Sequence, residues 1–127
     1  MMHKLSKVNI ILLHQKVIEQ TGGSHGVRDM NLVESAISRA FATFDGKDLY
    51  QRTEDKIVAI TFGLINNHGF VDGNKRIGIA AMLLLLKLNG YILNYSQEEL
   101  IVMGLSIANG NMNEVGINDW ISQHKQG

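Results

Sequence analysis

Apolar side chains recur every three or four positions along most of the chain, the spacing of helices that bury one face. Capping and breaking residues divide this pattern into separate helices, and no internal repeat or linker divides them into groups. We therefore expect a single domain over residues 1–127, all-α in class, built as a compact bundle of about six helices around a buried central helix. The expected helices begin at caps on Ser6, on Asp29 or Asn31, on Thr53, on Ser96 and near Asn113, and one more runs from Arg76 to Asn89.

Two stretches add detail to this pattern. From Arg76 to Asn89 the residues are apolar on nearly all sides, which is typical of a central helix covered by several neighbours. The apolar face of the second helix extends as far as Phe44, and residues 45–48 form a turn signal. The segment that follows, residues 49–51, is too short to classify and could be a strand or a flap, so a short flap hairpin is one alternative here.

Composition narrows the class of protein. Hydrophobic residues make up 45% of the 127 positions, which is enough for a packed core. The 12 basic residues balance the 12 acidic ones, which argues against nucleic acid or an anionic membrane as a partner. There is no Cys, and the five His residues lack metal-ligand spacing. The N-terminus has no signal-peptide pattern and residues 77–86 are too short to span a bilayer, so we expect a cytoplasmic protein.

The residues with recognisable chemistry are concentrated at positions 68–76, between two expected helices. Gly73 allows the backbone to turn so that successive N–H groups form an anion-binding nest, and the next helix directs its positive end to the same place. Lys75 and Arg76 add two positive charges, and the amide of Asn74 can donate to an oxyanion or brace the turn. Together these residues indicate a phosphate-binding loop.

Two further side chains in the loop indicate catalysis. Asp72 places a carboxylate among these positive groups, where a bridging Mg²⁺ would reconcile it with bound phosphates. His68 has an imidazole, a group that can accept a proton from an incoming hydroxyl. A base, a metal ligand and a phosphate cradle are the components of phosphoryl or nucleotidyl transfer. Each residue also has a structural interpretation, as a helix cap, a turn or a solvated charge, and we interpret Phe70 as a core anchor of the loop.

The order and spacing of these residues resemble the core motif of the Fic/Doc family, His-x-Phe-x-Asp/Glu-Gly-Asn-x-Arg. The likeness extends over nearly the whole chain, because residues 22–23, 26–29, 32–37 and 88–91 resemble the death-on-curing (Doc) branch of the family. The motif positions are occupied by His68, Phe70, Asp72, Gly73, Asn74 and Arg76.

The resemblance implies a protein kinase that uses ATP and Mg²⁺ to phosphorylate a Thr of elongation factor Tu, which arrests translation. Lys75 and Ile79 stand where adenylylating members usually have Gly and a second Arg, and both changes look like Doc toxins. By the same resemblance His68 is the catalytic base and Asp72 is the Mg²⁺ ligand. The implied catalytic set is His68, Asp72 and Arg76, and the implied phosphate-binding set is Gly73, Asn74, Lys75 and Arg76.

Several positions near the motif depart from the family pattern or stand beside it. Gly69 replaces a common Pro, from which we expect little effect, and Asn66 stands where Doc-type proteins can have an Arg. In the preceding loop we expect structural roles, with Asp29 as a helix cap and Arg28 as its brace.

The resemblance also implies partners. The self-inhibiting Ser/Thr-x-x-x-Glu-Gly/Asn string of many Fic proteins is absent from the sequence. A separate Phd-like antitoxin is therefore expected, with a disordered tail that folds as a helix into a groove. The protein substrate is expected to dock by strand addition at the flap, Gly46 to Gln51. Two other functions stay open: a Fic-type adenylyltransferase acting on Ser, Thr or Tyr, and a catalytically silent Fic-fold binding module.

Overall fold

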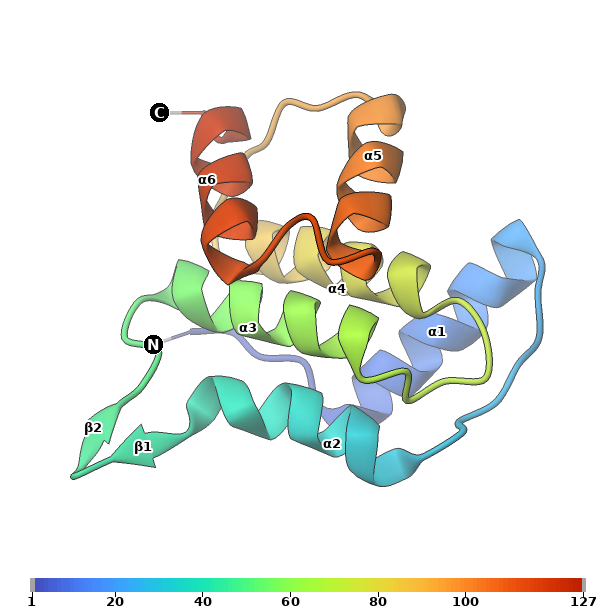
Figure 1. Cartoon of the computed structure of the whole chain (residues 1–127), viewed down its shortest axis with the longest axis horizontal. Helices are drawn as coiled ribbons and strands as arrows, with labels where there is room; N and C mark the ends of the chain where they lie inside the picture. Colours follow the sequence, from blue (N-terminus) through green and yellow to red (C-terminus); the bar gives the residue numbers. More distant parts are fainter. Residues whose placement is uncertain (1, 127) are drawn as a thin grey trace.

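The computed structural model of the chain describes residues 2–126 and consists of helices joined by short loops, with one small hairpin (Figure 1). This confirms the predicted all-α class and the expected number of helices among the described residues. A 3₁₀ turn, η1 (Arg39–Phe41), follows the second helix, and the hairpin strands are β1 (Thr43–Phe44) and β2 (Lys47–Asp48). The helices are α1 (Lys7–Thr21), α2 (Met30–Ser38), α3 (Thr53–Asn66), α4 (Asn74–Leu88), α5 (Gln97–Ala108) and α6 (Glu114–His124).

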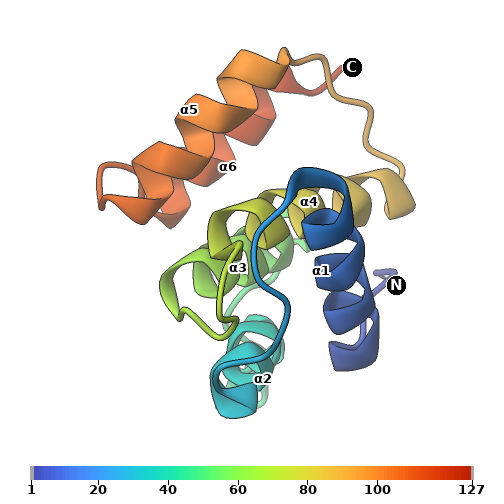
Figure 2. The same cartoon turned by 90° about the vertical axis from the view of Figure 1, so that its right-hand side faces the viewer.

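The helices form three layers (Figures 1 and 2). The middle layer consists of α3 and α4, which pack along each other. On one side α5 and α6 cover this pair, and on the other side α1 packs against α4 and α2 against α3. The core is continuous through the layers, and its fully buried side chains include Ile10, Ile57, Phe70, Met82, Ile107 and Ile121.

The most enclosed helix is α3 rather than α4. Ten of the fourteen residues of α3 are buried, compared with six of the fifteen residues of α4. On α4 the side chains of Ile79, Ala80 and Leu83 are half-buried because they line a groove shared with α1 and α5. The apolar pattern on all sides of α4 therefore reflects an open apolar face as well as a buried one. Within residues 2–126, no helix is long and apolar enough to cross a membrane.

Most helix starts agree with the capping residues read from the sequence. Ser6 and Ser96 each begin a capping box, at the starts of α1 and α5. Of the two candidates for α2, the cap is Asp29, whose carboxylate accepts the N–H of Asn31. Asn113 caps α6 by accepting the N–H of Gly116. Four of the six helices therefore start where a side-chain oxygen predicted they would.

The start of α3 differs from the prediction. Thr53 was expected to cap this helix, but it is the first helical residue, and Arg52 precedes it with an extended backbone. The guanidinium of Arg52 lies 2.9 Å from the carboxylate of Asp55, which also accepts the N–H of Arg52. A charged pair therefore fixes this helix start in place of a hydroxyl cap.

The hairpin forms, but at residues 43–48 instead of the predicted 46–51. Its strands pair around Asp45 and Gly46, which both have positive φ, as in a type I′ turn. Phe44 lies in β1 and is exposed, so its expected burial on the second helix is wrong, because α2 ends at Ser38. The hairpin lies at the opposite end of α3 from the α3–α4 loop (Figure 1). A helix of fourteen residues is about 21 Å long, so the two features are far apart.

A buried lysine fixes the hairpin to the N-terminal end of α3. Lys56 lies in the first turn of this helix, and its ammonium group donates to the carboxylate of Asp48 at 3.2 Å. It also donates to the carbonyls of Tyr50 and Gln51. Because these acceptors lie on the hairpin and just after it, this part of the chain is held at a distance from the motif loop.

Candidate active site

The motif residues lie in the loop from His68 to Gly73 and in the first turn of α4. Gly73 has a φ of 75° and is the N-cap of α4, which begins at Asn74. The helix thus starts two residues before the predicted Arg76, because a left-handed glycine turns the chain before the apolar pattern begins. Lys75 is therefore part of the first helical turn, whose N–H groups have no acceptor within the helix. The positive end of the helix dipole faces this loop.

Asn74 braces the loop through its side-chain amide. Its Nδ2 donates to the carbonyl of Phe70 at 3.0 Å, and its Oδ1 accepts the N–H of Phe70 at 3.1 Å. Of the two roles expected for this amide, the contacts within the chain are those of a brace. The ring of Phe70 is 1% exposed, which confirms its interpretation as a core anchor.

His14, in α1, supports the other side of the loop. Its ring stacks on Phe70 with 3.9 Å between centroids, and its Nε2 donates to the carbonyl of Asp72 at 2.7 Å. A carbonyl only accepts, so Nε2 is the protonated nitrogen of the ring. No motif identifies His14, and the available signal was its place on the buried stripe of α1 between Ile10 and Ile18.

The carboxylate of Asp72 is held by a network of donors. Its Oδ2 accepts the N–H of Ser24 at 3.1 Å, its Oδ1 accepts the N–H of Gly73 at 2.8 Å, and Arg76 lies 3.5 Å from Oδ1. The hydrogen bonds from Ser24 and Gly73, with the charge of Arg76, lower the pKa of Asp72 below its ordinary value. The side chain is 45% exposed, so a charged carboxylate is accessible to a cation.

The donor set around Asp72 fits a metal ion only in part. Among residues 2–126 there is no cluster of three or more His, Cys, Asp or Glu side chains. A cation at this carboxylate needs its other ligands from water and from the phosphates of a nucleotide. Mg²⁺ suits this arrangement because it keeps several waters and commonly binds one or two carboxylates together with substrate phosphates.

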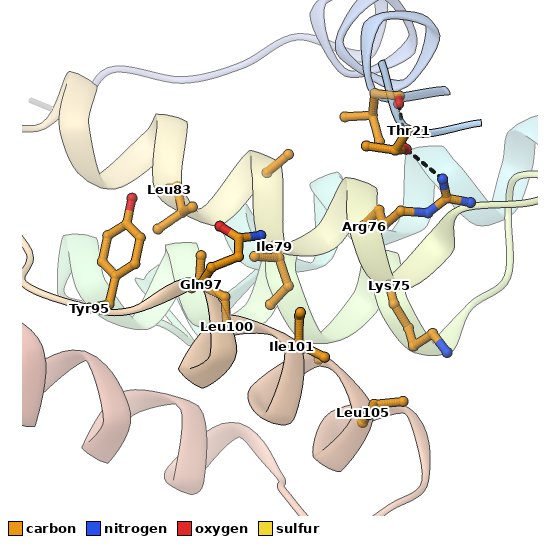
Figure 3. Close-up of a pocket in the computed structure, with 13 residues that line it drawn as sticks. Thr21, Lys75, Arg76, Ile79, Leu83, Tyr95, Gln97, Leu100, Ile101 and Leu105 are labelled. Atoms are coloured by element: carbon orange, nitrogen blue, oxygen red, sulfur yellow. Dashed lines mark hydrogen bonds between the residues drawn. The ribbon is translucent and has the colours of Figure 1, made fainter. Parts of the chain in front are cut away.

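The two cations of the first turn have different surroundings. Arg76 donates through Nη1 to the hydroxyl of Thr21 at 2.6 Å and to the carbonyl of Gly22 at 2.7 Å, and so joins the end of α1 to the motif (Figure 3). Lys75 points away from Arg76 and is exposed (Figure 3). Lys75 is therefore directly accessible to an anion, whereas Arg76 also holds the site together.

His68 is exposed, and its backbone has a φ of 53°. Its carbonyl accepts a hydrogen bond of 2.7 Å from Nε of Arg28. The predicted role of Arg28 as a brace of Asp29 is thus wrong. Asp29 caps α2 with its own carboxylate, and its N–H and that of Arg28 both donate to the carbonyl of Gly69, which turns the Arg28 side chain towards the motif.

The glycine-rich connection between α1 and α2, residues 22–29, lies against the motif loop (Figures 1 and 2). Val27 and Phe70 form an antiparallel bridge between the two segments. Gly23 packs on the carboxylate of Asp72, where an added Cβ would lie 2.5 Å from Oδ2. The sequence indicated only a loop here, because pairing between segments so far apart leaves no local pattern.

Gly69 allows the motif loop to approach α2 closely. An added Cβ at this position would lie 2.6 Å from Cγ2 of Val33 and 3.0 Å from its backbone N. Contacts this short require a neighbour to move, and here the neighbour is a helix backbone. The glycine in place of the family's common Pro therefore has a local packing reason, whereas little effect was expected.

A groove of about 490 Å³ begins beside Lys75 and Arg76 and continues between α1, α4 and α5 (Figure 3). Ile101 and Leu105, on α5, have about half of their surface exposed there. The other apolar side chains of the groove include Val17, Ile79, Leu83 and Leu100.

Comparison with known proteins identifies the family of the chain. A curated relative, Toxin Doc of Mycolicibacterium smegmatis, is 45% identical over 69 residues, which cover 54% of this chain and 53% of the relative. The matched part thus spans about half the length of that relative. Residues 4–86 match the Fic/DOC family, and this range includes the motif, the segment packed against it and most of α4. The chain belongs to the Fic/DOC family.

Proposed function

We propose that this protein is a Doc-type toxin that transfers a phosphoryl group from ATP to a hydroxyl of a target protein, with elongation factor Tu as the expected target. One observation carries this proposal. A single loop brings together an exposed imidazole at His68, a charged carboxylate at Asp72 and the positive end of α4. The likeness to a protein named Toxin Doc supports a toxin of this type, and the reaction class is the one that the resemblance of the motif implies.

In the proposed reaction His68 acts as the base. Its neutral imidazole accepts the proton of the target hydroxyl, whose oxygen attacks the γ-phosphorus of ATP while ADP leaves. When bound at Asp72, Mg²⁺ would neutralise charge on the phosphates. The first turn of α4 holds phosphate oxygens with its N–H groups, and the ammonium of Lys75 supplies a full positive charge.

Asn74 and Arg76 contribute mainly by holding this arrangement. The amide of Asn74 fixes the backbone of Phe70, and the guanidinium of Arg76 ties the loop to the end of α1. The Nη2 group of Arg76 lies near Asp72, so it also adds positive charge where the phosphates bind. We expect their loss to change the geometry of the site as well as its affinity for the nucleotide.

We further propose that the groove between α1, α4 and α5 receives the helical tail of a Phd-like antitoxin. The groove is apolar and open, which suits the apolar face of an amphipathic helix. Its end at Lys75 and Arg76 favours acidic residues on the incoming helix. A helix in this position would lie beside the phosphate-binding turn and block it.

The function is tested by intact-mass analysis of purified elongation factor Tu after incubation with the protein, ATP and Mg²⁺. The expected result is a gain of one phosphate, lost with the His68→Ala variant. A gain of one AMP would instead identify the Fic-type adenylyltransferase. An unchanged mass would reject elongation factor Tu as the target.

The antitoxin site is tested by titrating a candidate antitoxin peptide against groove variants. Ile101→Asp and Leu105→Asp place a charge on the apolar wall and should weaken binding more than tenfold. Val115→Asp is the control, because Val115 is also an exposed aliphatic residue but lies on α6, outside the groove. Equal affinity in all three variants would contradict the assignment.

A further inference from the structure

The backbone of His68 has an unusual conformation that the surrounding chain must maintain. Asp45 and His68 are the non-glycine residues with positive φ between residues 2 and 126. Asp45 occupies a two-residue hairpin turn, which requires positive φ. His68 directly follows Asn67, the C-cap of α3, where helices often end in a left-handed residue that is usually Gly. Because His68 has a Cβ, this conformation costs energy there, and contacts from elsewhere help to maintain it.

Those contacts come from residues 28 and 29. The N–H groups of Arg28 and Asp29 donate to the carbonyl of Gly69 at 2.8 and 3.0 Å. The side chain of Arg28 donates through Nε to the carbonyl of His68 at 2.7 Å. Two consecutive carbonyls are thus held by three donors. Only the donor to His68 belongs to a side chain, so it can be removed without altering the backbone.

We propose that Arg28 is a positioning residue for His68. The hydrogen bond from Nε fixes the plane of the peptide between His68 and Gly69, and this plane limits the backbone angles available to His68. Since the side chain projects from that backbone, the bond also limits the direction in which the imidazole points. The consequence for catalysis rests on the proposed function, whereas the conformational claim stands without it.

Packing on the other side of the loop makes this single bond important. Gly69 lies so close to Val33 of α2 that no Cβ fits between them, which fixes Gly69 in place. Phe70 is fixed by Asn74 and by the ring of His14. Gly69 and Phe70 are therefore each held by several contacts, whereas the carbonyl of His68 is held by Arg28.

The competing explanation is that Arg28 acts through its positive charge and not by positioning His68, because the guanidinium is exposed beside the motif. Three substitutions separate the two explanations. Arg28→Gln places an N–H donor at the chain position of Nε and removes the charge. Arg28→Met has a similar length and no donor. Arg28→Lys keeps the charge but has a methylene group where Nε was.

The test is an NMR comparison of the amide and imidazole signals of His68, identified by their loss in His68→Gln. We expect these signals to shift and broaden in Arg28→Met and Arg28→Lys and to return close to their wild-type positions in Arg28→Gln. Wild-type signals in Arg28→Met would overturn the proposal, and so would shifted signals in Arg28→Gln. If Arg28→Met fails to fold, the comparison of Arg28→Gln with Arg28→Lys still decides.

A kinetic comparison follows if the wild type proves active. Arg28→Met should lower kcat about tenfold or more with the KM for ATP changed less than about twofold, and Arg28→Gln should recover most of kcat. A rise in the KM for ATP in Arg28→Gln, absent in Arg28→Lys, would assign the residue to nucleotide binding and overturn its positioning role. Because the NMR signals need no activity, failure of the proposed function would be seen separately.

Discussion

The ring of His14 lies nearly parallel to the ring of Phe70, with 13° between their planes and 3.9 Å between their centroids. The same imidazole donates to the carbonyl of Asp72, so one side chain of α1 contacts the motif through both its face and its edge. His14 is 1% exposed, and the contact is therefore fully removed from water. It links the first helix to the proposed metal ligand through the backbone of the loop.

Replacing His14 should cost much of the stability of the loop. His14→Ala leaves a cavity beside Phe70 and a buried carbonyl without its donor, so we expect the free energy of unfolding to fall by about 2–4 kcal/mol. Urea titration measures this change. The exposed His3 offers the control, because His3→Ala should change stability by less than about 0.5 kcal/mol. Similar values for the two variants would contradict the role of His14.

Gly22 and Gly23 form a matched pair for testing the contact with Asp72. Both have positive φ, so an alanine at either position strains the backbone by about 1–2 kcal/mol. An added Cβ at Gly22 meets open space, whereas at Gly23 it lies 2.5 Å from the Asp72 carboxylate. We expect Gly23→Ala, and not Gly22→Ala, to weaken Mg²⁺-dependent binding of ATP by at least tenfold in calorimetry. Equal affinity of the two variants for ATP would show that the contact of Gly23 with Asp72 does not affect the function of this carboxylate.

Asn74→Asp tests the brace across the loop with almost no change in shape. A carboxylate can still accept the N–H of Phe70, but it would face the carbonyl of Phe70 without a hydrogen to donate. We expect the free energy of unfolding to fall by about 1–3 kcal/mol, measured by thermal or urea unfolding. Asn109→Asp is the control at an exposed helix end. A variant at position 74 as stable as this control would show that Asn74 does not brace the loop.

The pair formed by His124 and Glu99 should make stability depend on pH. Nε2 of His124 lies 2.5 Å from the carboxylate of Glu99, and the hydrogen bond with His124 lowers the pKa of Glu99. Burial opposes the charge on His124, but the bonds to Glu99 and to the carbonyl of Trp120 outweigh it and raise the pKa of His124. His124 and Glu99 are therefore both charged at pH values between the pKa of Glu99 and the pKa of His124.

The direction of the pH dependence follows from these shifts. The raised pKa of His124 adds stability that is fully present below about pH 6.5 and is lost as the pH rises through its folded value. The lowered pKa of Glu99 adds stability above about pH 4.3 that is lost in stronger acid. Glu99→Gln keeps an acceptor for the N–H of Ser96 but removes the charge. The free energy of unfolding of Glu99→Gln, measured by urea titration, should fall furthest below the wild-type value near about pH 5.5, and the difference should shrink above about pH 7.5. A difference that does not vary with pH would exclude the charged pair as its source.

Sequence patterns predicted the helices and the motif because both depend on local spacing. Ser6 and Ser96 cap helices with side chains that act within one turn, and the residues from His68 to Arg76 share one loop and one helical turn. Such features need no knowledge of the rest of the chain. They accounted for the fold class and for the centre of the candidate site.

The residues that support the site were not predictable in the same way. His14, Gly23 and Arg28 contact the motif from at least forty positions away, and each contact depends on how α1 and its following loop lie against α4. Arg28 and Asp29 are neighbours in sequence, which favoured a local brace, but pairing with Gly69 directs Arg28 to His68 instead. The partner of Arg28 is therefore set by contacts between distant segments, which the local sequence does not reveal.

The burial of α4 also differs between the prediction from sequence and the structure. A helix with apolar residues on nearly all sides is usually enclosed, and α4 was predicted to be so. In the structure Ile79 and Leu83 line an open groove, and α3 is the more buried helix. A surface that is apolar because a partner covers it has the same pattern as a core, so sequence alone does not separate the two.

The most direct test of the active centre measures the transfer of a labelled phosphate from ATP to protein. Wild type and His68→Ala are incubated with Mg²⁺ and a bacterial lysate, using ATP labelled at the γ-phosphate in one reaction and at the α-phosphate in another. We predict a labelled protein from the γ-labelled ATP alone, and no such band with His68→Ala. Label from neither position, or a band that persists without the imidazole of His68, would contradict the claim that this loop is the active site of a phosphoryl transferase.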